Sequence, residues 1–238
     1  MPYISVLIPL YNGVEYLEEC VQSILCQTYK DFDIWIGVNG HTTDTVAKLA
    51  LNLREKDLRI HVHIQGPSIQ GKVQSLNDLM NYAEGEWIAL LDVDDLWAPT
   101  KLEEQIMAKS ALAKNVAVIG TMCEYFGEFH GKPEIPTGFL DSSSFANVNP
   151  IINSSALVHR SYCRWRYTEH CYGMEDYDLW MRIALTGGRL YNLPKVLCYH
   201  RIHTTSAFNS KGHSPEAMQT LYRAALSTYF YFSPDTIV

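Results

Sequence analysis

Strand-like and helix-like patterns alternate along residues 1–110, and this alternation limits the folds that the chain can adopt. Four apolar runs are predicted to be strands: Ile4–Pro9, Asp33–Asn39, Ile60–Ile64 and Glu86–Leu91. Apolar residues at helical spacing follow each run, at Val14–Leu25, at Val46–Leu53, at Lys72–Ala83 and after Pro99. A βαβαβαβα order is the signature of a parallel sheet with helices on both faces. The sequence therefore predicts an α/β fold.

Polar residues follow the predicted strands at the edge where ligands bind in such sheets. The stretch WIALLDVDDLW carries Asp92, Asp94 and Asp95 directly after a strand, and Pro9–Asn12 and Asn39 end two other strands. Crowded carboxylates repel one another, and burying one without a partner is costly. A cation, or a ligand that carries one, removes both problems. An acidic turn in which Asp94 or Asp95 caps the next helix is the alternative, and the spacing alone leaves both interpretations open.

The second half of the chain is less regular. Its predicted strands are Val116–Gly120, Ser154–His159 and Lys195–His200, and its predicted helices are Glu175–Leu185 and a final helix that opens at Ser214-Pro215. Residues 127–150 are rich in Gly, Pro, Ser and Asn and are predicted to form a long loop with little structure of its own. No linker and no internal repeat divides the chain, so we expect a single domain.

Composition and charge narrow the possible functions. Hydrophobic residues make up 47% and charged residues 19%, as in an ordinary globular protein. The net charge of −7 offers no basic stripe, which argues against nucleic acid as a partner. The N-terminus has no basic signal-peptide region, and no apolar run reaches the roughly 18 residues of a membrane span. The six cysteines form no CxxC pair and are expected to be reduced thiols. We expect a soluble, cytoplasmic protein, with peripheral contact to the cytoplasmic face of a membrane left open.

Several sequence blocks together resemble glycosyltransferase family 2. The blocks are PLYNG (9–13), EYLEECVQSILCQTYKDFDIWI (15–36), GKVQSLN (71–77), GEWIALLDVDD (85–95) and MEDYDLWMR (174–182). The resemblance covers most of residues 3–205. It implies the GT-A fold, a nucleotide-diphosphate sugar donor, a glycan or other hydroxyl-bearing acceptor, a divalent metal (Mn²⁺ or Mg²⁺) and transfer with inversion at the anomeric carbon.

The acidic cluster matches the DxD motif of the family through Asp92-Val93-Asp94, with Asp95 as a further carboxylate. The resemblance implies that one aspartate of this group binds the metal and its neighbour contacts the ribose of the donor. Which of Asp94 and Asp95 does which stays open. A hard cation held by carboxylates is also the natural bridge to two phosphates.

The segment Tyr199–His203 resembles one that folds over the donor diphosphate in GT-A enzymes. We therefore expect Arg201 to meet a phosphate and His203 to complete the metal shell. A histidine of the core or the surface is the alternative for His203.

Glu175-Asp176 resembles the family's ED motif, which opens a helix at the acceptor side. Inversion in a single displacement needs a base that takes the proton of the attacking hydroxyl, and we predict Asp176 in this role. The helix macrodipole favours an ionised carboxylate at this position. Helix capping by Asp176 or Asp178 is the competing interpretation. Trp180 in the same block is predicted either to stack on an acceptor sugar or to lie in the core.

Three short stretches near the expected donor depart from the family pattern or add to it. Asn39 stands where many members carry an aspartate that accepts a hydrogen bond from uracil, and the Asn oxygen can still accept that bond. UDP is therefore the first choice of nucleotide. Pro9, Leu10 and Tyr11 are expected at the base pocket, although packing is an equal alternative for Tyr11. Lys72, at the start of a helix, either pairs with a phosphate of the donor or is an exposed lysine.

The resemblance also divides the single GT-A domain. Residues 1–110 are expected to bind the nucleotide-sugar, residues 111–212 to form the acceptor side, and residues 213–238 to form a C-terminal helix. The aromatic run Tyr229–Phe232 packs on the domain by default, with a second subunit in a homodimer or a lipid surface as alternatives.

Two rival functions remain. A magnesium-dependent phosphatase of the haloacid-dehalogenase type also ends a strand in DxD, but its motif normally lies on the first strand, whereas here it follows the fourth. A non-catalytic sugar- or nucleotide-binding module on the same scaffold is the second rival, because Asp is absent at position 39. The retained carboxylates Asp92, Asp94, Asp95 and Asp176 argue against it.

Overall fold

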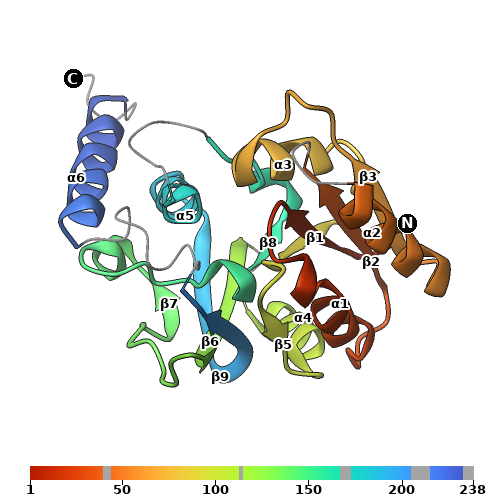
Figure 1. Cartoon of the computed structure of the whole chain (residues 1–238). Helices are drawn as coiled ribbons and strands as arrows, with labels where there is room; N and C mark the ends of the chain where they lie inside the picture. Colours follow the sequence, from red (N-terminus) through yellow and green to blue (C-terminus); the bar gives the residue numbers. More distant parts are fainter. Residues whose placement is uncertain (40–43, 113–114, 167–172, 205–214, 233–238) are drawn as a thin grey trace.

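The first half of the chain forms the predicted parallel strands (Figure 1). The computed structural model describes residues 1–39, 44–112, 115–166, 173–204 and 215–232. The strands β1 (Ile4–Leu10), β2 (Phe32–Val38), β3 (Ile60–Ile64) and β4 (Trp87–Leu90) lie parallel in the order β3-β2-β1-β4. Four helices accompany them: α1 (Leu17–Leu25), α2 (Asp44–Lys56), α3 (Gly71–Leu79) and α4 (Lys101–Ala111). The α/β prediction is confirmed.

The second half continues the same sheet with both strand directions. Its strands are β5 (Leu96–Trp97), β6 (Val116–Gly127), β7 (Gly138–Leu140), β8 (Leu157–His159) and β9 (Arg189–Ile202). Within the described residues the sheet has the order β3-β2-β1-β4-β8-β6-β9-β5, and β7 pairs with β9. β8 is antiparallel to β4 and β6, whereas β6 and β9 run parallel. The helices α5 (Glu175–Leu185) and α6 (Pro215–Phe232) complete the fold.

Apolar side chains on the two faces of the sheet form two separate parts of the core. On β1, alternate residues from Ile4 to Leu10 face the cluster that includes α1, α2 and Leu102 of α4. Leu7 faces the opposite cluster, which is built with residues of α3, α5 and α6. Helices therefore cover both faces, which leaves the carboxyl ends of the parallel strands as the edge where a ligand can bind.

The loop expected at residues 127–150 contains structure that the sequence analysis missed. β7 pairs with β9 within it, and a 3₁₀ turn, η2 (Ser142–Phe145), follows with a capping box between Asp141 and Ser144. The prediction of little structure was wrong for this part, because a three-residue strand is too short to show a periodic pattern. β6 and β9 are also longer than predicted, and β5, which pairs with β9, was not predicted.

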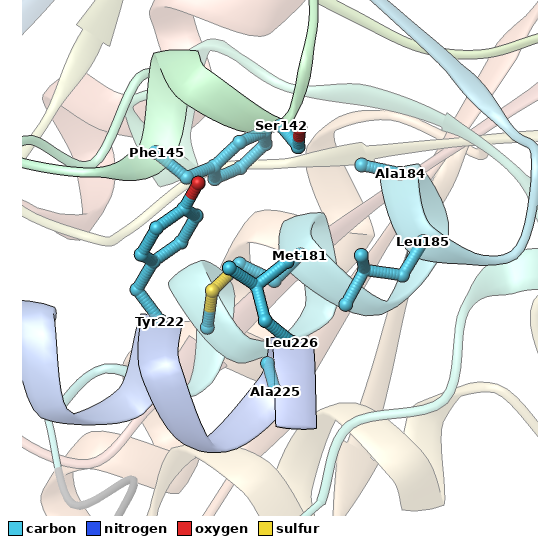
Figure 2. A pocket seen from close by; sticks show the side chains of 8 residues that line it. All are labelled: Ser142, Phe145, Met181, Ala184, Leu185, Tyr222, Ala225 and Leu226. Atoms are coloured by element: carbon cyan, nitrogen blue, oxygen red, sulfur yellow. The ribbon is translucent and has the colours of Figure 1, made fainter. Parts of the chain in front are cut away.

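The C-terminal helix α6 packs on α5 (Figure 2). Leu221, Tyr222 and Ala225 of α6 belong to the cluster that includes Met181 of α5. A small cavity of about 10 Å³ remains between α5, η2 and α6, and Figure 2 shows its apolar lining. That volume is about the smallest that holds one water molecule, so the cavity is a packing gap rather than a substrate site. The side chains of Tyr229–Phe232 lie outside those that the structure describes.

Candidate functional site

The aspartates 92, 94 and 95 lie on a tight turn at the carboxyl end of β4. The backbone N–H of Asp95 donates to the carbonyl of Asp92 at 3.0 Å, which closes the turn. Gly13, after β1, has a positive φ of 79°, and a Cβ there would lie 3.0 Å from Cγ1 of Val93. The loop after β1 therefore approaches the turn closely, and glycine permits both the backbone conformation and the approach.

Asp92 is held by a lysine and an asparagine. Nζ of Lys72 lies 2.7 Å from its Oδ1 and 2.8 Å from its Oδ2. Nδ2 of Asn153 lies 3.2 Å from both oxygens, and the backbone N–H of Asp92 donates to Oγ of Ser154 at 3.1 Å. Burial raises the pKa of Asp92, but the charge and hydrogen bond of Lys72, together with His200 and Asn153, outweigh burial, so the pKa is lowered. Asp92 is therefore a paired carboxylate in this structure.

Asp94 faces a histidine. Nε2 of His203 lies 3.0 Å from Oδ2 of Asp94, and the His203 ring is tilted against Tyr16. Burial, together with the charges of Asp95 and Asp92, raises the pKa of Asp94. A positive charge near Asp94 would relieve this repulsion.

Asp95 is fully buried, and both of its side-chain oxygens have hydrogen-bond partners. Its Oδ2 lies 3.0 Å from Nδ1 of His200, and its Oδ1 accepts the backbone N–H of Arg201 at 2.9 Å. Although burial lowers the pKa of His200, Asp95 raises it to about 9, so His200 is a cation at neutral pH. Asp95 thus joins the turn to the end of β9.

Arg201 links the turn to α1. Its Nε donates to the carbonyl of Asp94 at 3.0 Å, and its guanidinium lies 2.7 Å from Glu19. The guanidinium stacks between the rings of Tyr16 and Phe126, at 4.5 and 4.3 Å from their centroids. Arg201 lies beside the aspartates, and its predicted contact with a donor phosphate stays a prediction.

Glu175 and Asp176 open α5, and the structure brings them to the same place. Oδ2 of Asp176 accepts from Nδ2 of Asn149 at 2.9 Å, and its Oδ1 accepts the backbone N–H of Tyr177 at 2.8 Å. Burial raises the pKa of both carboxyl groups, Glu175 and Asp176. Asp178, the other capping candidate, is bound by Arg166 and Arg182 and is thus removed from this site.

Lys72 connects the two acidic groups. It lies on the first turn of α3, as expected, and its Nζ lies between Asp92 and Glu175, at 4.0 Å from the latter. Burial lowers the pKa of Lys72, but the charges of Asp92, Glu175 and Asp176 raise it by a larger amount. The pKa of Lys72 is therefore raised, and Lys72 is protonated at neutral pH. The interpretation of Lys72 as an exposed lysine is therefore wrong.

The expected nucleotide-pocket residues differ in exposure. The side chain of Leu10 is fully buried, so only its backbone can contact a ligand. The backbone of Asn39 donates to the carbonyl of Leu10 at 2.8 Å, and its side-chain amide donates to Gly71 at 3.3 Å. Pro9 is partly buried, and Tyr11 is 47% exposed. The donor contacts of Pro9, Leu10, Tyr11 and Asn39 stay predictions.

Trp180 belongs to the core. It has no exposed surface, and its indole N–H donates to the carbonyl of Ile151 at 3.1 Å. Of the two interpretations of Trp180, packing is the one that this geometry supports.

A buried lysine, Lys101, lies near the turn. Nζ of Lys101 lies 3.9 Å from the centroid of Trp97 and 2.9 Å from Oε1 of Gln105. The Trp97 indole N–H donates at 2.6 Å to the carbonyl of Ser154, the residue whose hydroxyl bonds the backbone of Asp92. Burial lowers the pKa of Lys101 to about 7. Lys101 is thus connected to Asp92 through Trp97 and Ser154.

Sequence reasoning missed several polar residues around the aspartates: Asn149, Asn153, Ser154, Lys101 and His200. The asparagines lie in an irregular polar segment, and Lys101 resembles any surface lysine at the start of a helix. Only His200, next to Arg201 in a block already singled out, had a sequence signal.

Neither a ready-made metal cage nor a membrane span is found in the described part of the chain. In residues 1–39, 44–112, 115–166, 173–204 and 215–232, no three His, Cys, Asp or Glu side chains are grouped so that they could hold a metal ion. None of the helices in these ranges is both long and apolar enough to cross a membrane. The five cysteines among these residues are free thiols, as predicted, and Cys171 lies outside them.

Asp94→Asn and Asp95→Asn should affect stability in opposite ways. Neutralising Asp94 removes repulsion, so we expect an unchanged or higher melting temperature without added ligands. Neutralising Asp95 removes the charge that binds His200, and a hydrogen bond to a charged group is worth about 1.5–3 kcal/mol. We expect a decrease in the melting temperature of roughly 5–10 °C. Equal melting temperatures for the two variants, measured by calorimetry, would contradict this division of roles.

The pH dependence of stability should contain a contribution from Lys101. An unfolded lysine stays protonated up to about pH 10.4, whereas buried Lys101 loses its proton near pH 7. Between these pH values the unfolded state binds more protons, so the contribution to the free energy of unfolding rises with pH. We expect Lys101→Met to flatten this rise in urea unfolding between about pH 7 and 10. Lys48→Met, at an exposed position of α2, is the matched control and should keep the slope of the wild type.

Comparison with known proteins agrees with the site. The model of the family "Glycosyl transferase family 2" matches residues 5–165. The chain is 29% identical to the E. coli UDP-Glc:alpha-D-GlcNAc-diphosphoundecaprenol beta-1,3-glucosyltransferase WfaP, over 89% of this chain and 82% of WfaP. Solved structures with the same fold include S. aureus TarS in complex with UDP-GlcNAc (TM-score 0.71, 15% identity, 98% of this chain and 74% of that one). Another is the mannosyltransferase PcManGT from Pyrobaculum calidifontis with GDP-Man and Mn²⁺ (TM-score 0.67, 16% identity, 98% and 76%). The chain therefore belongs to glycosyl transferase family 2 and is a glycosyltransferase with the GT-A fold.

Proposed function

We propose that this enzyme transfers a sugar from a UDP-sugar to a hydroxyl group of a glycan or another acceptor, with inversion at the anomeric carbon. The observation that carries the proposal is the position of Lys72, which lies 2.7 Å from Asp92 and 4.0 Å from Glu175. The carboxylates expected at the donor and those expected at the acceptor therefore lie within reach of one side chain. A single displacement needs such proximity, because the hydroxyl attacks while the bond to the diphosphate breaks.

We assign the base to Asp176. Burial raises its pKa, which strengthens the carboxylate as a proton acceptor, while its place in the first turn of α5 and nearby Lys72 favour the ionised form. Asn149 and the backbone of Tyr177 each donate one hydrogen bond to it, and a carboxylate has about four acceptor positions. Asp176 can therefore accept the proton of the acceptor hydroxyl as its oxygen bonds to the anomeric carbon.

We assign the divalent ion, Mn²⁺ or Mg²⁺, to Asp94 and His203. The two side chains meet at 3.0 Å, and a cation there would relieve the repulsion that raises the pKa of Asp94. Mg²⁺ is usually held by one or two carboxylates together with substrate phosphates rather than by a protein cage, which fits this donor set. When bound, the ion would neutralise charge on the leaving diphosphate.

The roles of the neighbouring residues follow from their contacts. Asp95 bonds His200 and the backbone of Arg201, so of the two aspartates left open for the metal we assign Asp94 to the ion and Asp95 to support. Asp92 and Lys72 face the donor side, and Arg201 closes over the turn. Residues 1–110 are proposed as the donor half, residues 111–212 as the acceptor half and residues 213–238 as an appended helix.

The choice of UDP rests on Asn39 and on two similar proteins. Asn39 directly follows β2 and bonds the backbone of Leu10 at the end of β1, and its oxygen is proposed to accept from uracil. WfaP is named for UDP-Glc, and TarS was solved with UDP-GlcNAc, whereas PcManGT was solved with GDP-Man. The acceptor in the name of WfaP is a lipid diphosphate. We therefore also propose a cytoplasmic enzyme that acts at the cytoplasmic face of a membrane, with homodimer formation through the C-terminal helix as the alternative role of that helix.

A donor screen tests this function. With Mn²⁺ or Mg²⁺, we expect release of UDP from a UDP-sugar in a panel of UDP-Glc, UDP-GlcNAc and GDP-Man, and loss of that activity in excess EDTA. Full turnover in EDTA would overturn the metal assignment. Preference for GDP-Man would remove Asn39 from its proposed role.

Asp176→Asn separates catalysis from binding. Asn keeps the shape of the side chain but cannot act as a base, and general-base catalysis typically contributes about 10²–10⁴-fold. We expect transfer to fall by that order, with UDP affinity by calorimetry and the melting temperature close to those of the wild type. Asp141→Asn, at the exposed cap of η2, is the control and should keep full transfer. A stable Asp176→Asn variant with unchanged transfer would assign the base elsewhere, first to Glu175.

A further inference from the structure

A second cavity, of about 730 Å³, lies beside α3, and its lining differs in charge from most of the chain. Among the described residues, its polar lining consists of Asn77, Ser161, Arg164, Trp165 and Arg166, with no acidic side chain. The chain as a whole carries a net charge of −7, and the cavity next to α1 is lined by Glu15, Glu18 and Glu19. Of these two cavities, the one beside α3 therefore has the lining that suits an anion.

Arg164 is the available cation of this cavity. It is exposed, and in the part of the chain that the structure describes no acceptor pairs with its guanidinium; its own backbone carbonyl accepts from Arg182 at 2.7 Å. Arg166 beside it is oriented by Asp178, at 2.6 Å. Arg182 also binds Asp178, so this carboxylate is shared by Arg166 and Arg182. Asp178 and these two arginines together keep a net positive charge.

Hydrogen bonds and burial hold part of the cavity wall in place. The side chain of Asn77 exchanges two hydrogen bonds with the backbone of Trp165, at 2.9 and 3.1 Å. Trp165 is 3% exposed, and its indole N–H has no acceptor among the described residues. This part of the wall is therefore ordered before an anion binds, which reduces the entropic cost of binding.

The cavity is joined to the candidate site through two helices. Asn77 lies on α3, whose first turn carries Lys72, and five residues correspond to about 7.5 Å along a helix. Asp178, which binds Arg166, lies two residues after Asp176 on α5. A ligand that occupied both places would carry its anionic group some distance from the hydroxyl that reacts.

We propose that this cavity is a phosphate-binding subsite, in which Arg164 and Arg166 bind a phosphoryl or diphosphoryl group of the acceptor. The role in acceptor binding rests on the proposed function, whereas the binding of phosphate does not. The arginine fork suits phosphate oxygens because it offers two parallel N–H donors. The acceptor class that follows is a phosphorylated glycan, or a glycan linked through phosphate to a lipid.

Binding of a soluble sugar phosphate tests the subsite without turnover. The probe is glucose 1-phosphate, measured by NMR titration with the donor site filled by UDP and Mg²⁺, and methyl glucoside is the neutral comparison. We expect saturable binding of glucose 1-phosphate alone. Arg164→Ala should weaken it about 10- to 100-fold, which corresponds to the loss of a charge-assisted hydrogen bond. Arg54→Ala, which removes an exposed arginine of α2, should leave the affinity unchanged.

Three results would overturn the proposal: no binding of glucose 1-phosphate in the millimolar range, equal binding of methyl glucoside, or equal affinity of the wild type and Arg164→Ala. Co-sedimentation with vesicles of phosphatidylglycerol and phosphatidylcholine separates the possible sources of phosphate. Binding to anionic vesicles that depends on Arg164, in the absence of sugar-phosphate binding, would replace the subsite by a membrane contact. Failure of the proposed function would appear separately, as absent turnover in the donor screen with sugar-phosphate binding intact.

Discussion

The ion pair between Lys72 and Asp92 is the interaction on which the rest of the site depends. Asp92, Glu175 and Asp176 come from places far apart in the chain, and like charges this close would repel one another in a partly buried space. One ammonium group offsets that repulsion and brings the ends of β4, α3 and α5 together. The folded chain can therefore carry several carboxylates at one edge before any substrate arrives.

Asp95 has a complementary role at the other side of the turn. It sits at the centre of a buried polar network with His200 and the backbone of Arg201, and Arg201 in turn reaches Glu19 of α1. The end of β9 is thereby fixed over the turn after β4, although more than a hundred positions separate them in the chain. The adjacent aspartates thus differ in their surroundings. Asp95 is fully buried in this network, whereas Asp94 is partly exposed beside His203.

The sequence predicted the parallel strands, their helices and the place of the acidic residues, because long periodic segments and charged strand ends leave clear patterns. It did not predict β5, β7 or the extent of β9, whose pairing depends on partners distant in the chain. The separate roles of neighbouring carboxylates could not be predicted from the sequence either. Asp94 and Asp95 are the same type of residue and differ only in burial and in their partners. Asn149 and Asn153 were missed for the same reason, since nothing in a polar loop marks which amide meets a carboxylate.

The segment that carries η2 is attached to α5 at two points beside the proposed base. The hydroxyl of Tyr177 donates to the carbonyl of Phe145, and Asn149 holds Asp176 itself. Residues 128–137 show no comparable bond to α5 among the described residues. A chimaera that exchanges part of the proposed acceptor half should therefore take residues 128–137, with its second junction before residue 138. Exchanging all of residues 128–150 would also replace Phe145 and Asn149, which hold α5 and the proposed base.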